Sequence, residues 1–286
     1  MHFQLSVEQR ALKDGTRDLL AGRFGRDALR DAVERPVVDR ALWRELGAAG
    51  LFSLCLPEAD GGVGLGLPEA VVVFEECGRA LVPGPLVATF LAAGEVAGAA
   101  TGEAVVTRPY GGLVPWLDEA DAVRGAVTGA VPLTSVDPLT PLHRVPGEPV
   151  APPPEATLLY AAEQLGSAGR TLDMAVQHAR EREQFGQPVG AFQAVKHLCA
   201  EMLVRVEVAR AAVYAAAVTR DPVEIAAAEL LADEAAVQGA RDCLQVHGGM
   251  GFTWEADVHL HLKRAWVRAE LGGSARAAEE VLAAAL

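Results

Sequence analysis

Apolar residues recur at helical spacing up to a short glycine- and proline-containing turn at residues 181–193, and the pattern resumes directly after it. Steps of three and four residues are typical of a buried helix face. We therefore expect two long helices joined by a hairpin, with Arg182, Gln184 and Phe185 at the turn. The spaced residues are Leu172, Met174, Ala175 and Ala179 before the turn, and Val195, Leu198, Met202, Val206, Ala209 and Val213 after it.

Arg182 is the most informative side chain of this first turn. A guanidinium offers a planar fork of donors that suits phosphate or carboxylate groups. An arginine that merely decorates a helix end is the alternative, and this segment by itself does not separate the two.

A second turn, at residues 245–252, follows an alanine-rich helical pattern. It contains Gln245, Gly248, Gly249 and Gly251, so that three of its glycines fall within four positions. Glycines allow positive φ and a close approach of the backbone to a ligand. A helix C-cap followed by a loop is the simpler reading of this turn alone.

The two turns together, about sixty residues apart, resemble those of the acyl-CoA dehydrogenase family. In that family the motifs Arg-x-x-Phe-Gly and Gln-x-x-Gly-Gly-x-Gly hold the pyrophosphate and adenine end of FAD across a subunit interface. The resemblance therefore implies FAD as cofactor, with Arg182 at the pyrophosphate. The residues that it implies as FAD contacts are Arg182, Gln184, Phe185, Val189, Phe192, Gln193, Gln245, Gly248 and Gly249.

Residues 1–100 predict an N-terminal helical domain. The helices expected there are 5–24, with Ser6 as N-cap, then 37–49 and about 68–80, with a short extended segment at 50–58. A flexible glycine loop at 61–64 lacks the Lys-Ser/Thr of a phosphate-binding loop, which favours a structural role. This region resembles the N-terminal helical domain of the same family, because four motifs follow one another in the same order: Trp, Gly-Leu, Pro-Glu-x-x-Gly-Gly and Glu-Glu-x-Gly-Arg-Ala.

Residues 101–155 lose the helical period and are rich in proline. Ala104–Thr107 and Ala122–Val131 are candidate strands. The family has a β-barrel-like domain at this place, which covers the flavin ring and shapes the acyl-CoA site. Its Thr-Glu-Pro-x-x-Gly-Ser-Asp loop and its Trp-Ile-Thr-Asn-Gly-like strand are absent here, and the segment is roughly half the usual length. We expect a reduced middle β domain or linker.

Residues 156–286 predict a C-terminal four-helix bundle that carries the FAD half-site. The expected helices are 157–182, 192–219 and 222–246, followed by a loop and a last helical stretch at 258–286. Pro222 suits the first turn of the third helix. The fold class is therefore mainly α and acyl-CoA dehydrogenase-like.

The catalytic base of the family is a glutamate, found at one of two positions in different members. Gly272 stands at the first position, which follows Lys263-Arg264-Ala265. Glu270 lies two residues away, and on a helix this shift turns its side chain by about 200° from the position of the base. Ala156 stands at the second position, with Glu155 beside it. Glu163, two turns further on, suits packing or an ion pair. We therefore assign no catalytic residue to this chain and keep Glu155, Glu163 and Glu270 as weak candidates.

Composition excludes several other classes of protein. The formal net charge of −13 argues against a nucleic-acid partner. The seven histidines and four cysteines form no metal-ligand pattern, and the unclustered cysteines suggest reduced thiols in the cytoplasm. No leader or membrane-spanning run is evident.

A complete nucleotide half-site without a base resembles the short subunit of heterotetrameric (α2β2) acyl-CoA dehydrogenases of bacterial steroid side-chain degradation. That resemblance implies a longer, related partner that holds the flavin ring, the acyl-CoA and the catalytic glutamate. It also implies a steroid side-chain CoA ester as substrate and an electron-transferring flavoprotein as acceptor. A self-sufficient homo-oligomeric enzyme and a non-catalytic scaffold subunit remain as alternatives.

Overall fold

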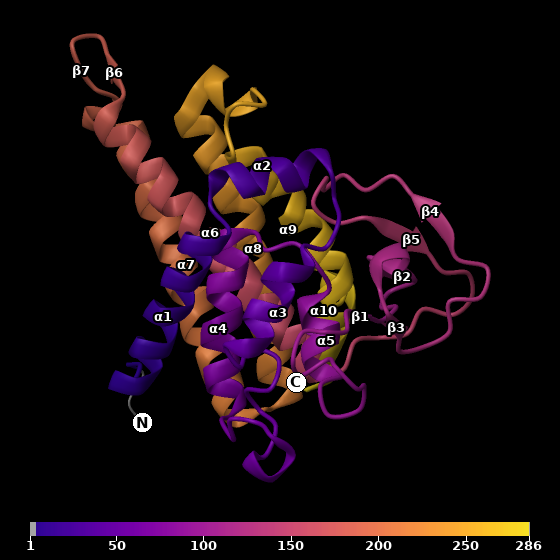
Figure 1. Cartoon of the computed structure of the whole chain (residues 1–286). Helices are drawn as coiled ribbons and strands as arrows, with labels where there is room; N and C mark the ends of the chain where they lie inside the picture. The colour runs from indigo at the N-terminus through magenta and orange to yellow at the C-terminus, as the bar shows by residue number, and fades with distance from the viewer. Residues whose placement is uncertain (1–3, 286) are drawn as a thin grey trace.

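The computed structural model describes residues 4–285 and confirms a mainly helical chain of the expected architecture. The helices form one body, and a group of short strands projects from its side (Figure 1). The helices are α1 (Val7–Arg23), α2 (Arg26–Glu34), α3 (Arg40–Ala48), α4 (Leu67–Ala80), α5 (Leu86–Leu91), α6 (Pro154–Glu181), α7 (Gln193–Thr219), α8 (Pro222–His247), α9 (Val258–Gly272) and α10 (Ala275–Ala284). Short 3-10 helices are η1 (Glu58–Asp60), η2 (Leu117–Glu119), η3 (Val189–Ala191) and η4 (Gly248–Phe252).

The predicted N-terminal helices are present. Ser6 caps α1 as expected, because its side chain accepts from the Gln9 backbone while the Gln9 side chain accepts from the Ser6 backbone. The helices predicted at 37–49 and 68–80 are α3 and α4. Helices α2 and α5 were not predicted, because they are short and begin without a side-chain cap, so that the usual start signals are lacking.

The prediction of an extended segment at residues 50–58 is wrong. Residues 51–56 make consecutive turns, closed by local hydrogen bonds such as Leu56 N–H to the Ser53 carbonyl at 3.1 Å. Phe52 in this run is only 1% exposed. The apolar run therefore reflects burial under the neighbouring helices, which periodicity alone cannot distinguish from a strand.

The middle region contains very short strands. β1 pairs in parallel with β3, and β5 lies between β2 and β4 in an antiparallel sheet. The strand predicted at 122–131 divides into β3 and β4, because Gly125 and Gly129 take positive φ and turn the chain between them. These strands are β1 (Val106–Thr107), β2 (Leu113–Pro115), β3 (Ala122–Val123), β4 (Val131–Leu133) and β5 (Leu142–Arg144).

Helices α6 to α9 form the predicted C-terminal bundle, with α8 packed against the other three. Pro222 occupies the first turn of α8 as expected, and α6 begins at Pro154 because proline is also tolerated there. The last predicted stretch, 258–286, is not continuous: Gly273, with φ +137°, separates α9 from α10. Among residues 4–285, no helix is long and apolar enough to cross a membrane.

Helices α4 and α6 cross in close contact, which fixes the N-terminal helices against the bundle. A Cβ at Gly166 would lie 1.8 Å from the Glu75 carbonyl oxygen, and one at Gly78 would lie 2.0 Å from that of Glu163. Only glycine fits at this distance.

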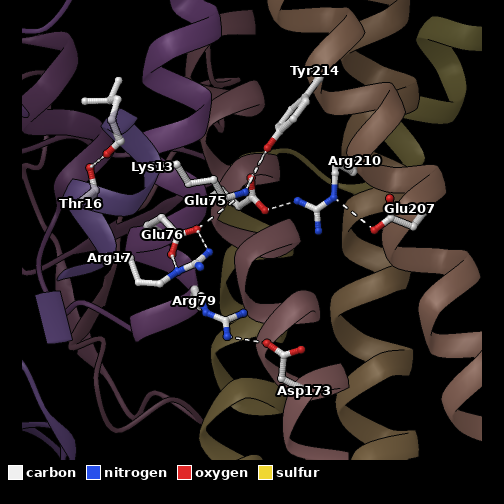
Figure 2. Close-up of polar contacts among 11 residues, drawn as sticks. Lys13, Thr16, Arg17, Glu75, Glu76, Arg79, Asp173, Glu207, Arg210 and Tyr214 are labelled. Atoms are coloured by element: carbon white, nitrogen blue, oxygen red, sulfur yellow. Dashed lines mark hydrogen bonds and ion pairs between the residues drawn. The ribbon is translucent and has the colours of Figure 1, made fainter. Parts of the chain in front are cut away.

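A charged cluster around Glu75 joins α1, α4 and α7 (Figure 2). Glu75 is 4% exposed, accepts from the Tyr214 hydroxyl at 2.5 Å and lies 2.7 Å from Lys13 Nζ. Burial alone would raise the pKa of Glu75, but Arg210 and Lys13 hold that pKa below its ordinary value. Nearby pairs are Arg17–Glu76 and Arg79–Asp173.

Candidate functional site

The first turn is a tight hairpin at the outer ends of α6 and α7 (Figure 1). Strand β6 (Glu183–Gln184) pairs with β7 (Gln187–Pro188). The loop residues Phe185 and Gly186 have φ of +56° and +78°, the signs required by a type I′ turn. A left-handed Phe185 costs on the order of 1 kcal/mol or more, and such strain clusters at functional sites. The turn presents this ring to the outside, where it is 91% exposed.

Arg182 follows the last residue of α6 and has a fixed backbone. Its N–H donates to the His178 carbonyl at 2.9 Å, and its own carbonyl accepts from Val189 N–H at 2.7 Å. The side chain is exposed, and no ion pair within residues 4–285 involves it. Its guanidinium is therefore available to an external anion. Of the other residues predicted at this turn, Gln184 and Gln193 are exposed, and Val189 and Phe192 are half-buried.

The second turn begins where α8 ends and continues as η4. Gly248 has φ +59°, and its N–H donates to the Gln245 carbonyl. Gly251 packs inward, because a Cβ there would lie 2.9 Å from the Leu244 carbonyl oxygen. At Gly248 and Gly249, by contrast, a Cβ would meet nothing within 4 Å. The backbone at these two glycines is therefore open to an approaching group.

A pair of stacked histidines joins the ends of α6 and α8, from which the two turns start. His178 on α6 and His247 at the end of α8 stack with ring centroids 4.1 Å apart and planes 25° from parallel. Neither histidine was predicted to have a role. Their positions held the signal, because one lies four residues before Arg182 and the other directly before Gly248.

One apolar cluster lies beneath both turns. It combines side chains from α6, α7, α8 and the start of α9, so the turns share a support rather than belonging to separate loops. Its members include Ala175, Ala179, Met202, Cys243, Leu244, Val246 and Val258, with Val189, Val195 and Leu198 packed against them.

This arrangement fits the nucleotide end of FAD. The exposed Arg182 guanidinium suits a pyrophosphate, and the open backbone at Gly248 and Gly249 permits close approach. Phe185 and Phe192, with ring centroids 6.0 Å apart in an edge-to-face arrangement, offer apolar surface to an adenine.

None of the candidate base positions holds a free, buried carboxylate. Glu155 and Glu270 are exposed. Glu163 is 4% exposed and paired: Arg268 Nη2 donates to its Oε1 at 3.1 Å, and Arg268 Nε lies 2.9 Å from its Oε2. The expectation that Glu163 forms an ion pair is confirmed. Gly272 is packed, because a Cβ there would lie 3.2 Å from Tyr160 Cβ.

The buried Arg264 ties the middle region to α9. Its Nε donates to Asp137 at 2.5 Å, and its Nη atoms donate to the carbonyls of Val82 and Leu139 at 3.2 and 3.3 Å. Lys263-Arg264-Ala265 stands in place of Arg-Asp-Ala of the family motif. Arg264, which replaces the aspartate, has a structural partner in Asp137.

Comparison with known proteins identifies the family. The model described as acyl-CoA dehydrogenase, N-terminal domain matches residues 6–103, and that described as acyl-CoA dehydrogenase, C-terminal domain matches residues 156–286. Acyl-CoA dehydrogenase IpdE2 of Mycobacterium tuberculosis is 37% identical over 299 residues, covering 94% of both chains.

Solved structures share the fold of this chain. A structure described as the Tcur3481-Tcur3483 steroid ACAD G363A variant matches with TM-score 0.81 and 26% identity, covering 97% of both chains. The ChsE4-ChsE5 complex from M. tuberculosis matches with TM-score 0.82 and 24% identity, over 99% of this chain and 98% of that one. Proteins of the family use FAD. The chain belongs to the acyl-CoA dehydrogenase family.

Proposed function

We propose that this chain is the short subunit of a heteromeric, FAD-dependent acyl-CoA dehydrogenase. It contributes the pyrophosphate and adenine half-site, and a longer related partner supplies the flavin-ring site, the acyl-CoA site and the catalytic base. One contrast carries this proposal. The two turns are ordered and are linked by the stacked rings of His178 and His247, whereas Gly272 and Ala156 stand at the two base positions.

Each residue has a binding role rather than a chemical one. Arg182 neutralises the pyrophosphate, Gly248 and Gly249 let their backbone approach it, and Gln184, Gln193 and Gln245 offer amides to the nucleotide. Phe185, Val189 and Phe192 cover the adenine. When bound, FAD supplies the acceptor for the hydride removed from the acyl chain.

We further propose a steroid side-chain CoA ester as the substrate of the complex. IpdE2 and the steroid ACAD pair support this substrate, as proteins similar to this chain. The ChsE4-ChsE5 complex and the Tcur3481-Tcur3483 pair likewise support a two-chain assembly. An electron-transferring flavoprotein would reoxidise the flavin.

Replacing Arg182 by alanine should lower FAD affinity of the complex at least about tenfold, because each charge-assisted hydrogen bond to a phosphate contributes roughly 1.5–3 kcal/mol. Flavin absorbance after equilibrium dialysis against FAD measures this loss. Arg44→Ala is the matched control, since Arg44 is an exposed arginine on α3. Unchanged FAD content in Arg182→Ala would contradict the assigned half-site.

A further inference from the structure

The stacked histidines His178 and His247 are the link between the two turns. The His178 carbonyl holds the backbone N–H of Arg182 at 2.9 Å, and His247 directly precedes Gly248. The two rings are therefore carried by the backbone segments that lead directly into the two turns. Neither ring has a role in the contacts proposed above.

The tautomer of His247 is set by its neighbour. Its Nδ1 lies 2.8 Å from the Cys243 carbonyl oxygen. Because a carbonyl can only accept, Nδ1 carries the proton and donates it. This bond fixes the plane of the His247 ring, so that His178 stacks on a ring that is already oriented.

Charge around the pair is unfavourable to a second proton. Two protonated rings whose centroids lie 4.1 Å apart repel each other. The pKa of His178 is lowered mainly by burial, and further by His247 and Arg182, whereas Glu181 acts to raise it. On the His247 side, Cys243 Sγ lies 3.6 Å from Nδ1. Burial raises the pKa of that thiol to about 12, so it carries no charge.

We propose that the His178–His247 stack is an acid-sensitive positioning device for the cofactor half-site. With at most one ring charged, the stack holds the first turn in register with the second. When both rings are charged, it separates and the half-site loses affinity for FAD. This inference rests on the proposed function, because it assigns regulation to the same site.

The test titrates FAD into the chain mixed with its longer partner, at about pH 7.5 and about pH 5.5. The wild-type dissociation constant should rise on the order of tenfold on acidification. His178→Phe keeps an aromatic ring but cannot be charged, so its affinity should match wild type at the higher pH and stay flat. His178→Ala should bind weakly at both values.

His259→Phe is the matched control. Burial, chiefly, lowers the pKa of His259 to about 4, so this residue stays neutral across the range tested. Its edge-to-face contact with Trp254 can be kept by phenylalanine. The control should show the same pH dependence as wild type.

A second readout uses the chain alone. Hydrogen exchange of residues 248–252, corrected for the intrinsic pH dependence of amide exchange, should accelerate at the lower pH in wild type but not in His178→Phe. A wild-type FAD affinity that is flat or rises on acidification would overturn the inference, as would normal binding by His178→Ala. If Arg182→Ala loses FAD while the histidine variants do not, the half-site stands and only the stack's role fails.

Discussion

Replacing Arg268 by alanine is expected to destabilise the chain by about 3–5 kcal/mol. Arg268 and Glu163 are 3% and 4% exposed, and they contact each other through both carboxylate oxygens. Removing the guanidinium leaves a carboxyl that must stay buried without its partner. Burial already raises the pKa of Glu163, so the carboxyl will take up a proton in part, and this limits the loss.

Urea unfolding followed by circular dichroism measures the change. The matched control is Arg276→Ala, because Arg276 forms an exposed pair with Glu280 four residues on, and such pairs contribute only about 0.3–0.5 kcal/mol. Equal, small losses in both variants would mean that the Arg268–Glu163 pair does not support the bundle.

Replacing Glu229 by glutamine should stabilise the chain at neutral pH by about 3 kcal/mol and flatten its pH dependence. Glu229 is 5% exposed on α8, and its Oε1 has no hydrogen-bond partner among the described residues. The carboxyl lies under the turn between α9 and α10, since a Cβ at Gly273 would lie 2.7 Å from that oxygen. Burial and then Asp233 raise the pKa of Glu229 to about 8.

The sign of this pH dependence of stability follows from which state binds the proton. With a folded-state pKa near 8 and an unfolded value near 4.5, the folded chain binds the extra proton between these values. The stability from this group is complete below about pH 4.5 and is lost as pH rises to about 8, by about 1.4 kcal/mol per pH unit. Asp233, whose pKa burial raises to about 7, acts in the same direction.

Unfolding at about pH 5.5 and about pH 7.5 tests this, with Glu279→Gln on the exposed face of α10 as control. Glu229→Gln should differ from wild type more at the higher pH. If Glu229→Gln changes the free energy of unfolding equally at both pH values, or lowers it at the higher pH, then Glu229 is not a buried neutral acid.

The long helices and both turns were predictable because their signals are local. Apolar spacing marks α6 and α7, and Gly186 and Gly248 mark the points where the backbone must reverse. The type of each turn follows from a few adjacent residues. The residues proposed to bind FAD therefore lie where the motifs placed them, at the ends of α6 and α8 and the start of α7.

The long-range contacts were not predictable in the same way. The stacking of His178 on His247 and the burial of Arg264 against Asp137 join residues far apart in sequence. No periodicity records which distant side chains will meet. The extended segment expected at 50–58 failed for a related reason, because burial and strand formation give the same apolar run.

Native mass measured together with bound FAD tests the central claim most directly. We expect the chain expressed alone to be colourless or insoluble, because we propose that it provides only one half of the cofactor site. Coexpression with the proposed longer partner should give a yellow tetramer with about two FAD, since in the proposed arrangement each site takes one chain of each kind. A yellow homotetramer with about one FAD per chain would contradict the account and mean that residues 101–155 complete the flavin site by themselves.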